Sequence, residues 1–276
     1  LQPKLEDRYF DIVDFISDIS SYLHSATVEQ EKKAVDQVSD LYESFLQSQR
    51  ELMPIEKPNW TDIDVTLLPH QGLGLIPFMN NYLLLGKRVQ MFMMGEALAR
   101  GAKGIMHSAI IRGMIHAEAQ EAQTPEVFLE KINKLIADDL LTPCIATAML
   151  FLYPEENKFA FFSGGYGQLW HLKEGNITSL QPEIKGIALG LDKEMEFHLL
   201  KGTWLPGETL ILTPFLNLKH SLTGEAILGE EMLLQVWKEY LDQPLLKQLE
   251  ALLRRAKSVD PSGIEEHSFL LVGFSH

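Results

Sequence analysis

The sequence predicts an α+β layered domain with largely antiparallel strands and helices gathered in blocks, preceded by a helical extension. Three observations support this class. Residues 5–52 repeat apolar side chains at helical spacing. From about residue 60 the chain changes to short apolar runs, mostly divided by Gly, Pro or Asn turns. The later helical patterns come in blocks rather than alternating with single strands, which is typical of an α+β architecture.

The N-terminal stretch, residues 5–52, contains two heptad-like apolar seams. Ser25-Ala26-Thr27 should interrupt them, and Thr27 with Gln30 fits a capping box that starts a second helix. The seams are formed by Ile12, Ile16, Ile19 and Leu23, and by Val35, Val38, Tyr42, Phe45 and Leu52. Two interpretations stay open: these helices pack back on their own domain, or they dimerise it or couple it to an upstream module. Pro54–Pro58 is interpreted as a linker, so we expect a helical regulatory segment at 1–57 and a folded domain at 58–276.

Within the folded domain the apolar patterns predict strands before and after two helices. The first helix covers 102–122, and the second begins at Thr124-Pro125-Glu126 and runs to about Asp139. A further helical region is expected at 223–257. The predicted strands are Val65–Leu68, Tyr82–Leu85, Val89–Met94, Ile145–Tyr153, Lys158–Ser163, Leu169–Leu172, Glu194–Leu200, Thr209–Thr213 and His267–Phe274.

Composition excludes several classes of function. The 276 residues are 46% hydrophobic, enough to bury a sizeable core, and their net charge of −14 argues against nucleic acid and against a basic membrane-surface patch. No stretch approaches the apolar length of a membrane span, and no signal peptide is present. The lone cysteine, Cys144, suits a reducing compartment and is interpreted as a core residue. Because the chain begins at Leu1 rather than Met, we expect it to be part of a longer protein, located in the cytoplasm or forming the cytoplasmic part of a membrane-anchored protein.

Most motifs that could carry chemistry have a structural interpretation. The glycines of 72–74 open no dinucleotide-binding βαβ unit, and 163–167 lacks the ending of a phosphate loop. His107 and His116 are too far apart on one helix to share a metal ion. The exception is MFMMGEALARG, where an apolar strand ends at a glycine followed by one acid, Glu96. Metal and acid/base sites are often built this way.

The order of strand, Gly, acid, short loop, Gly and helix in MGEALARGAKGIMHSAIIRGM resembles the PPM-type metal-dependent serine/threonine protein phosphatases, in the SpoIIE/RsbU branch. Four later segments are similar to family motifs in the same order. These are IATAMLFLYPEENKFAFFSGGYGQLWHL, GIALGL, LPGETLILTPF and IEEHSFLLV. The resemblance covers about residues 60–275 and implies a central β-sandwich flanked by helices, with two Mn²⁺ or Mg²⁺ ions at one end that activate water for attack on a phosphoester.

The family's acidic ligand positions are poorly filled in this chain. No Asp or Glu stands between Thr66 and Gly95, where the first ligand belongs. Glu96 falls at the bridging position, where the family has Asp, and Arg100 and Gly101 complete its loop. Pro214 takes the third position and Glu265-Glu266 the fourth. Two positions are therefore empty and two carry longer side chains, so Glu96 is expected to pair with a cation such as Arg100 or a neighbouring Lys.

Two functional hypotheses follow. In the favoured one, the domain is an inactive phosphatase fold, a pseudophosphatase that needs no metal and regulates a protein by binding it. The resemblance implies that this partner is a STAS anti-anti-sigma protein, an anti-sigma kinase or a related phosphatase, with possible homodimerisation through helices 5–52. In the alternative, Glu96, Glu265 and Glu266 bind Mn²⁺ or Mg²⁺ and the domain dephosphorylates a phosphoserine or phosphothreonine of the STAS protein.

Overall fold

The computed structural model describes residues 12–53, 56–60, 62–70, 72, 77–86, 88–139, 144–182, 186–214, 230–259, 261 and 269–275. Contacts divide the chain into two compact units, Leu1–Gln47 and Ser48–His276. This division falls ten residues before the boundary expected after residue 57. None of the helices in the described ranges is both long enough and apolar enough to cross a bilayer.

The described part of the first unit is helix α1, which runs unbroken over Ile12–Glu51 and continues into the second unit. The expected interruption at Ser25-Ala26-Thr27 is wrong. No Gly or Pro occurs anywhere in α1, and Ser, Ala and Thr cost a helix far less than those two residues do. The end of α1 is anchored inside the second unit, where Gln49, Leu52 and Met53 are buried.

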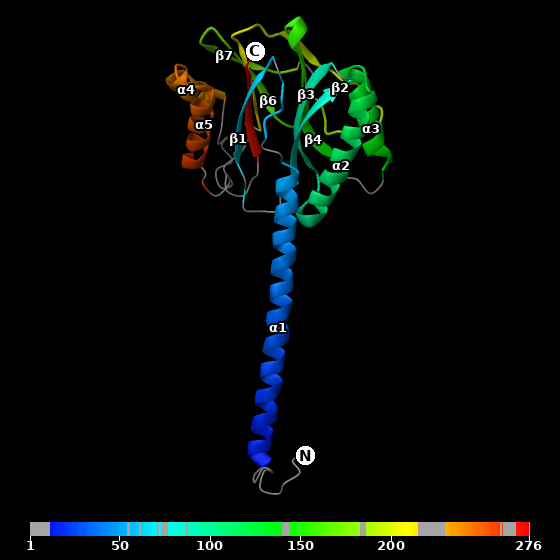
Figure 1. Ribbon diagram of the computed structural model, residues 1–276, viewed down its shortest axis with the longest axis vertical. Coiled ribbons are helices and arrows are strands. Elements are labelled where there is room, and N and C mark those ends of the chain that lie inside the picture. The colour runs from blue at the N-terminus through cyan, green and yellow to red at the C-terminus, as the bar shows by residue number, and fades with distance from the viewer. Residues whose placement is uncertain are drawn as a thin grey trace. The chain divides into compact units, whose positions relative to one another are not determined.

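The second unit is a β-sandwich of two five-stranded sheets whose named strands pair antiparallel. One sheet has the order β1-β10-β9-β6-β7 and the other β2-β3-β4-β5-β8 (Figure 1). The strands are β1 Asp64–His70, β2 Phe78–Leu85, β3 Val89–Ala97, β4 Ile145–Tyr153, β5 Lys158–Gly164, β6 Gln168–Lys173, β7 Asn176–Leu180, β8 Leu200–Thr203, β9 Thr209–Thr213 and β10 Phe269–Ser275.

Helices cover the outer face of each sheet, so the order of layers is helix, sheet, sheet, helix (Figure 1). Helices α2 (Gly101–Glu121) and α3 (Pro125–Asp138) lie on the β2–β8 sheet, and Phe128 of α3 contacts Phe151 of β4. Helices α4 (Glu230–Tyr240) and α5 (Leu245–Val259) lie on the other sheet, where Trp237 contacts Trp170 at a ring distance of 5.1 Å. The fold class implied by the resemblance is confirmed.

The main core lies between the two sheets. Aromatic and aliphatic side chains from alternate positions of the inner strands fill it, as period-two burial requires. Phe92 and Met94 of β3 face Leu210 and Leu212 of β9 and Phe274 of β10 across this layer. The alternation matters for the site, because it aims the next residue in the series, Glu96, toward the end of the same layer.

Several expected elements differ from the structure. Residues 194–199 are not a strand in the structure: the ladder between β5 and β8 stops at Phe161 and Leu200, and the end of β5 at Gly164 bridges to Gly186 instead. Strand β7 was not predicted. It pairs with β6 through a two-residue hairpin turn, in which Glu174 and Gly175 both adopt positive φ. The helical region 223–257 is two helices, since Pro244 lacks an N–H and stands just before α5; residues 223–229 lie outside the described ranges.

Candidate functional site

Glu96 lies near the end of β3, at the edge of the core between the sheets. Strand β3 is buried from Val89 to Gly95, and Glu96 is half-buried. The preceding glycine permits this arrangement, because a Cβ at Gly95 would lie 2.4 Å from the carbonyl oxygen of Ala146 and 2.9 Å from Cα of Thr147. The close approach of β3 and β4 therefore explains the glycine before the acid.

The residues opposite Glu96 in the sheet are apolar. In the β2–β3 ladder Glu96 pairs with Phe78, and in the β3–β4 ladder it pairs with Ala146. Phe78 is fully buried and lies 6.3 Å, ring to ring, from Tyr166. Neither neighbour carries an oxygen on its side chain, so neither could share a metal ion with Glu96.

The electrostatic surroundings of Glu96 favour its neutral form. Burial raises the pKa of Glu96 from 4.5 to about 7. The hydroxyl of Tyr166 is also buried, and its pKa is raised well above 10 by burial and, in second place, by the charge of Glu96. A carboxylate that binds Mn²⁺ or Mg²⁺ must be ionised, and here the surroundings oppose ionisation.

The expected ion pair between Glu96 and Arg100 is absent, so the prediction is wrong for Arg100. Arg100 is exposed and stands at the N-cap of α2 in an extended conformation, where its side chain makes no capping hydrogen bond. An exposed guanidinium gains little from pairing, because water already solvates its charge. Gly101 starts α2 with φ of +59°, in the left-handed region that glycine adopts without strain.

The third predicted position, Pro214, is buried directly after β9. A Cβ at Gly167 would lie 3.3 Å from Cε of Met94 in β3 and 3.3 Å from the carbonyl oxygen of Thr213 in β9. The ends of β3 and β9 therefore converge on Gly167, and the structure brings the strand ends that carry Glu96 and Pro214 to one region. Glu265 and Glu266, the fourth position, lie outside the described residues.

The described residues do not fit a two-metal centre. Within the described ranges, no three His, Cys, Asp or Glu side chains are grouped so that they could hold one ion. Mg²⁺ prefers an octahedral shell of oxygen atoms, and at this end of the sandwich Glu96 is surrounded by Phe78, Ala146 and Tyr166.

Sequence reasoning missed a polar cluster that joins α1, β2 and α2. Nε of Arg112 donates to Oδ1 of Asn81 at 2.9 Å, and a second guanidinium nitrogen donates to the carbonyl oxygen of Glu51 at 2.8 Å. Nε2 of His116 lies 3.2 Å from the same Asn81 oxygen. The sequence feature that could have predicted this cluster is the pair Asn80-Asn81 inside an otherwise apolar strand, because buried side-chain amides need hydrogen-bond partners.

Two other residues were interpreted as structural. His107 is buried on α2, which agrees with that interpretation. Cys144, expected in the core, is only half-buried, so that interpretation is wrong. It lies just before β4, where its carbonyl oxygen accepts a hydrogen bond from the amide of Leu98 at 2.8 Å.

Comparisons with known proteins agree with this fold. The sequence model of the family described as "Stage II sporulation protein E (SpoIIE)" matches residues 87–266, more than half of the chain. A comparison with curated protein sequences gave no significant match.

Three solved structures are among the similar ones. The SiaA PP2C domain of Pseudomonas aeruginosa has a TM-score of 0.70 at 15% identity, covering 88% of this chain and 98% of that one. The PP2C phosphatase domain of SpoIIE from Bacillus subtilis, solved with a fragment of its regulatory domain, has a TM-score of 0.62 at 12% identity, covering 78% and 64%. The RsbU and RsbW domains of Rv1364c from Mycobacterium tuberculosis have a TM-score of 0.62 at 10% identity, covering 77% and 59%. At these identities the likeness establishes the fold, and together with the family match it shows that the chain belongs to the SpoIIE family of PPM-type phosphatase domains.

Proposed function

We propose that this domain is a regulatory, non-catalytic member of its family that acts by binding a protein partner in a bacterial partner-switching system. The observation that carries the proposal is the state of Glu96. It stands at the strand end where the family's bridging acid belongs, but it faces Phe78 and Ala146 and its neutral form is favoured. A lone, partly protonated carboxyl group is a poor ligand for a hard divalent cation.

Exposed apolar side chains close to Glu96 support a role in binding. Leu98, two residues after Glu96, is 57% exposed, and on α2 Met106 and Ile110 are 59% and 44% exposed. Helix α2 also buries Ile105, Ile111 and Ile115 on its inner side, so it is apolar on both sides. A surface helix normally keeps a polar outer face, so exposed apolar side chains on the loop and helix that follow Glu96 favour protein binding. The partner we propose is a STAS anti-anti-sigma protein, an anti-sigma kinase or a related phosphatase.

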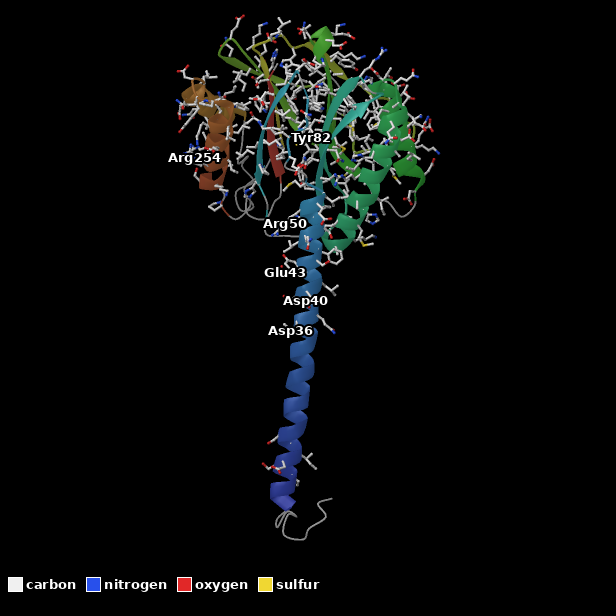
Figure 2. All side chains as sticks on the ribbon, in the orientation of Figure 1. Asp36, Asp40, Glu43, Arg50, Tyr82 and Arg254 are labelled. Atoms are coloured by element: carbon white, nitrogen blue, oxygen red, sulfur yellow. The ribbon has the colours of Figure 1, made fainter. Side chains whose placement is uncertain are left out.

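Helix α1 supports a homodimer through residues 5–52. Its side chains Val35, Val38, Leu41 and Tyr42 are 66%, 66%, 61% and 43% exposed. At about 100° per residue, Asp36, Asp40 and Glu43 fall on the opposite face of the helix. Figure 2 labels these three acids along α1. Two copies could therefore join their apolar faces while the acids stay in water. On this proposal 1–57 is the regulatory segment, 58–276 is the binding domain, and both lie in the cytoplasm.

Family membership favours one alternative, in which the domain is an active Mn²⁺- or Mg²⁺-dependent phosphatase for phosphoserine or phosphothreonine on a STAS protein. Glu96, Glu265 and Glu266 would then supply the ligands. The two proposals differ in whether the protein turns over a phosphoester with a divalent cation present.

The deciding experiment measures hydrolysis of p-nitrophenyl phosphate and of a phosphoserine peptide by the whole chain, with and without MnCl₂. We expect no metal-dependent rate above that of the Glu96→Ala variant. Glu130→Ala, which removes an exposed acid of α3, is the matched control. Manganese-dependent turnover that is lost in Glu96→Ala and kept in Glu130→Ala would establish the alternative.

A further inference from the structure

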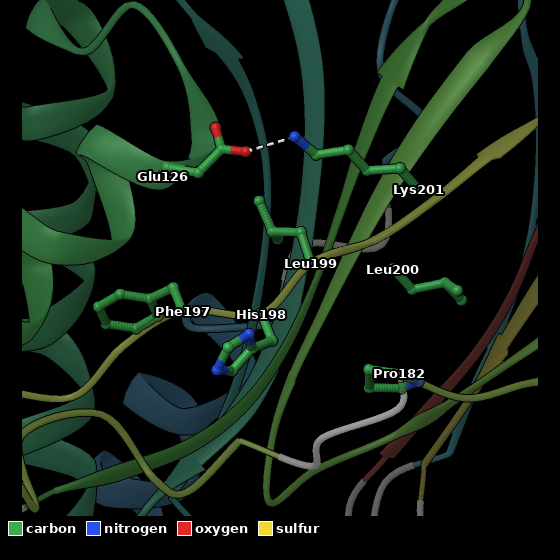
Figure 3. A pocket seen from close by; sticks show the side chains of 7 residues that line it. All are labelled: Glu126, Pro182, Phe197, His198, Leu199, Leu200 and Lys201. Carbon is green, nitrogen blue, oxygen red and sulfur yellow. Dashed lines mark ion pairs between the residues drawn. The ribbon is translucent and has the colours of Figure 1, made fainter.

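Strand β8 forms one edge of the β2–β8 sheet, and a cavity lies along it. The strand pairs with β5 on one side, and within the described part of the chain no strand pairs with its other side. The cavity has a volume of about 420 Å³ and is lined by Phe197–Lys201, together with Glu126 of α3 and Pro182 after β7 (Figure 3). We call this feature the β8 edge groove.

The lining shows that the groove follows the edge of the strand. Five consecutive residues line it, and consecutive residues of an extended chain point to opposite faces. Figure 3 shows Leu199 and Lys201 pointing to the side of Glu126, while Leu200 points away from them. A cavity that touches side chains from both faces of one strand lies against the strand's outer edge.

The chain that leads into β8 continues this edge. Met195, Phe197 and Leu199 are half-buried, whereas Glu196 and His198 are exposed, which is the period of an extended chain. Phe197 is held in place by Phe162 of β5, with ring centroids 5.6 Å apart. The groove thus presents the five consecutive residues Phe197–Lys201, of which Leu200 and Lys201 pair with β5.

One usual protection of a sheet edge, a lysine with a free charge, is weakened here. Natural edges are often guarded by a lysine whose free charge repels an incoming strand. Lys201 is in the right place, but its Nζ lies 2.7 Å from Oε1 of Glu126, at the start of α3 (Figure 3). The ion pair draws the lysine toward α3 and neutralises its charge, so the edge stays open.

We propose that the β8 edge groove binds an extended segment of the partner protein by strand addition. Outward N–H and C=O groups of an edge strand require an extended backbone as their partner. Every second side chain of the bound segment would be apolar and would contact Phe197 and Leu199. A small ligand is disfavoured, because small-ligand sites aim several unpaired polar groups at one point and here Glu126 and Lys201 are already paired with each other.

This inference deepens the proposed function by naming a docking surface, and it rests on the domain being a protein-binding module. Its test is separate from the phosphatase assay. The whole chain is used to select binders from a display library of random ten-residue peptides. An enriched peptide is then synthesised, its affinity measured by fluorescence anisotropy, and its footprint mapped by hydrogen exchange.

We expect the enriched peptides to alternate apolar residues and to slow exchange of the amides in 197–203. Leu199→Lys should weaken binding by at least about tenfold, because it places a free charge on the edge. Glu126→Gln should also weaken binding, because it releases Lys201. Leu246→Lys, which adds the same charge at a 41% exposed leucine of α5, is the control and should change affinity less than twofold.

Two results would overturn the inference. One is a failure to enrich any peptide. The other is enrichment of peptides that bind Leu199→Lys and Glu126→Gln as tightly as the native chain and protect amides elsewhere. Either result leaves the phosphatase question untouched, so the two proposals can fail separately.

Discussion

Phe78 lies directly opposite Glu96 in the antiparallel ladder between β2 and β3. The position that faces Glu96 across this ladder is thus a fully buried aromatic ring. This pairing changes how Glu96 should behave. Instead of sharing a cation with a second carboxylate, it lies against apolar side chains that favour its protonated form.

Replacing Glu96 by Gln should remove a pH dependence of stability. Burial holds the pKa of Glu96 at about 7 in the folded chain, above its ordinary value of 4.5. The stabilisation from the protonated form is therefore complete below about pH 4.5 and is lost as the pH rises through about 7. The shift is equivalent to at most about 3 kcal/mol. Urea unfolding should show that Glu96→Gln is much more stable than the native chain at pH 8 and that the difference is far smaller at pH 5; equal curves at pH 8 would contradict the assignment.

A pair of glycine substitutions should have opposite effects. Gly95→Ala places a Cβ against the Ala146 carbonyl and should destabilise the sandwich by about 3 kcal/mol. Gly113 lies on the exposed face of α2 with nothing near its Cβ position, and Gly113→Ala should stabilise by up to about 1 kcal/mol. Thermal and urea unfolding measures the free energy of unfolding of both variants relative to the native chain. Similar stabilities would mean that β3 and β4 do not approach as closely as described.

Arg112→Ala should loosen the attachment of the end of α1 to the sandwich. The variant loses the hydrogen bonds to Asn81 and to the Glu51 carbonyl, which should cost about 2 kcal/mol. It should also raise the pKa of His116, which is lowered first by burial and then by the charge of Arg112. An NMR titration of His116 reports the second effect. Arg254→Ala, at an exposed position of α5, is the control. An unchanged His116 titration in Arg112→Ala would contradict the close approach of Arg112 to His116.

The double variant Val38→Glu/Leu41→Glu should be monomeric. It puts charges into the exposed apolar face of α1, where a second copy would bury them. Light scattering coupled to gel filtration should give twice the chain mass for the native protein and the single chain mass for the variant. Asp36→Asn/Asp40→Asn changes the opposite face and should keep the native mass. A native chain that is monomeric at high concentration would end the dimer proposal.

Local signals predicted much of the fold. The N-cap at Thr124 was predicted from Thr-Pro-Glu, and its Oγ1 accepts a hydrogen bond from the Val127 amide at 3.3 Å. Strands β4 and β9 have the predicted bounds, because each is an apolar run with clear turns on both sides. Residues 194–199 had the right alternation, but a strand also needs a partner, and the ladder with β5 stops at Leu200 while the end of β5 bridges to Gly186. That competition is not visible in the sequence.

The site was predictable only in part. The acid at the end of β3 and the lack of acids before it can be read directly from the chain, and they suffice to question a metal centre. The register of β2 against β3 cannot be read in the same way, so the pairing of Phe78 with Glu96 needed the structure. The ion pair between Glu96 and Arg100 was predicted from their closeness in sequence, but the two side chains do not pair in the structure.

The most direct test of the central claim is calorimetric titration of the whole chain with Mn²⁺ at pH 7.5. If Glu96 lies among apolar side chains and no second carboxylate shares a metal ion with it, the native chain and Glu96→Ala should both show no saturable binding of Mn²⁺ up to millimolar concentration. Saturable, stoichiometric binding to the native chain that disappears in Glu96→Ala would show that a working metal site exists and that the domain is not the non-catalytic module proposed.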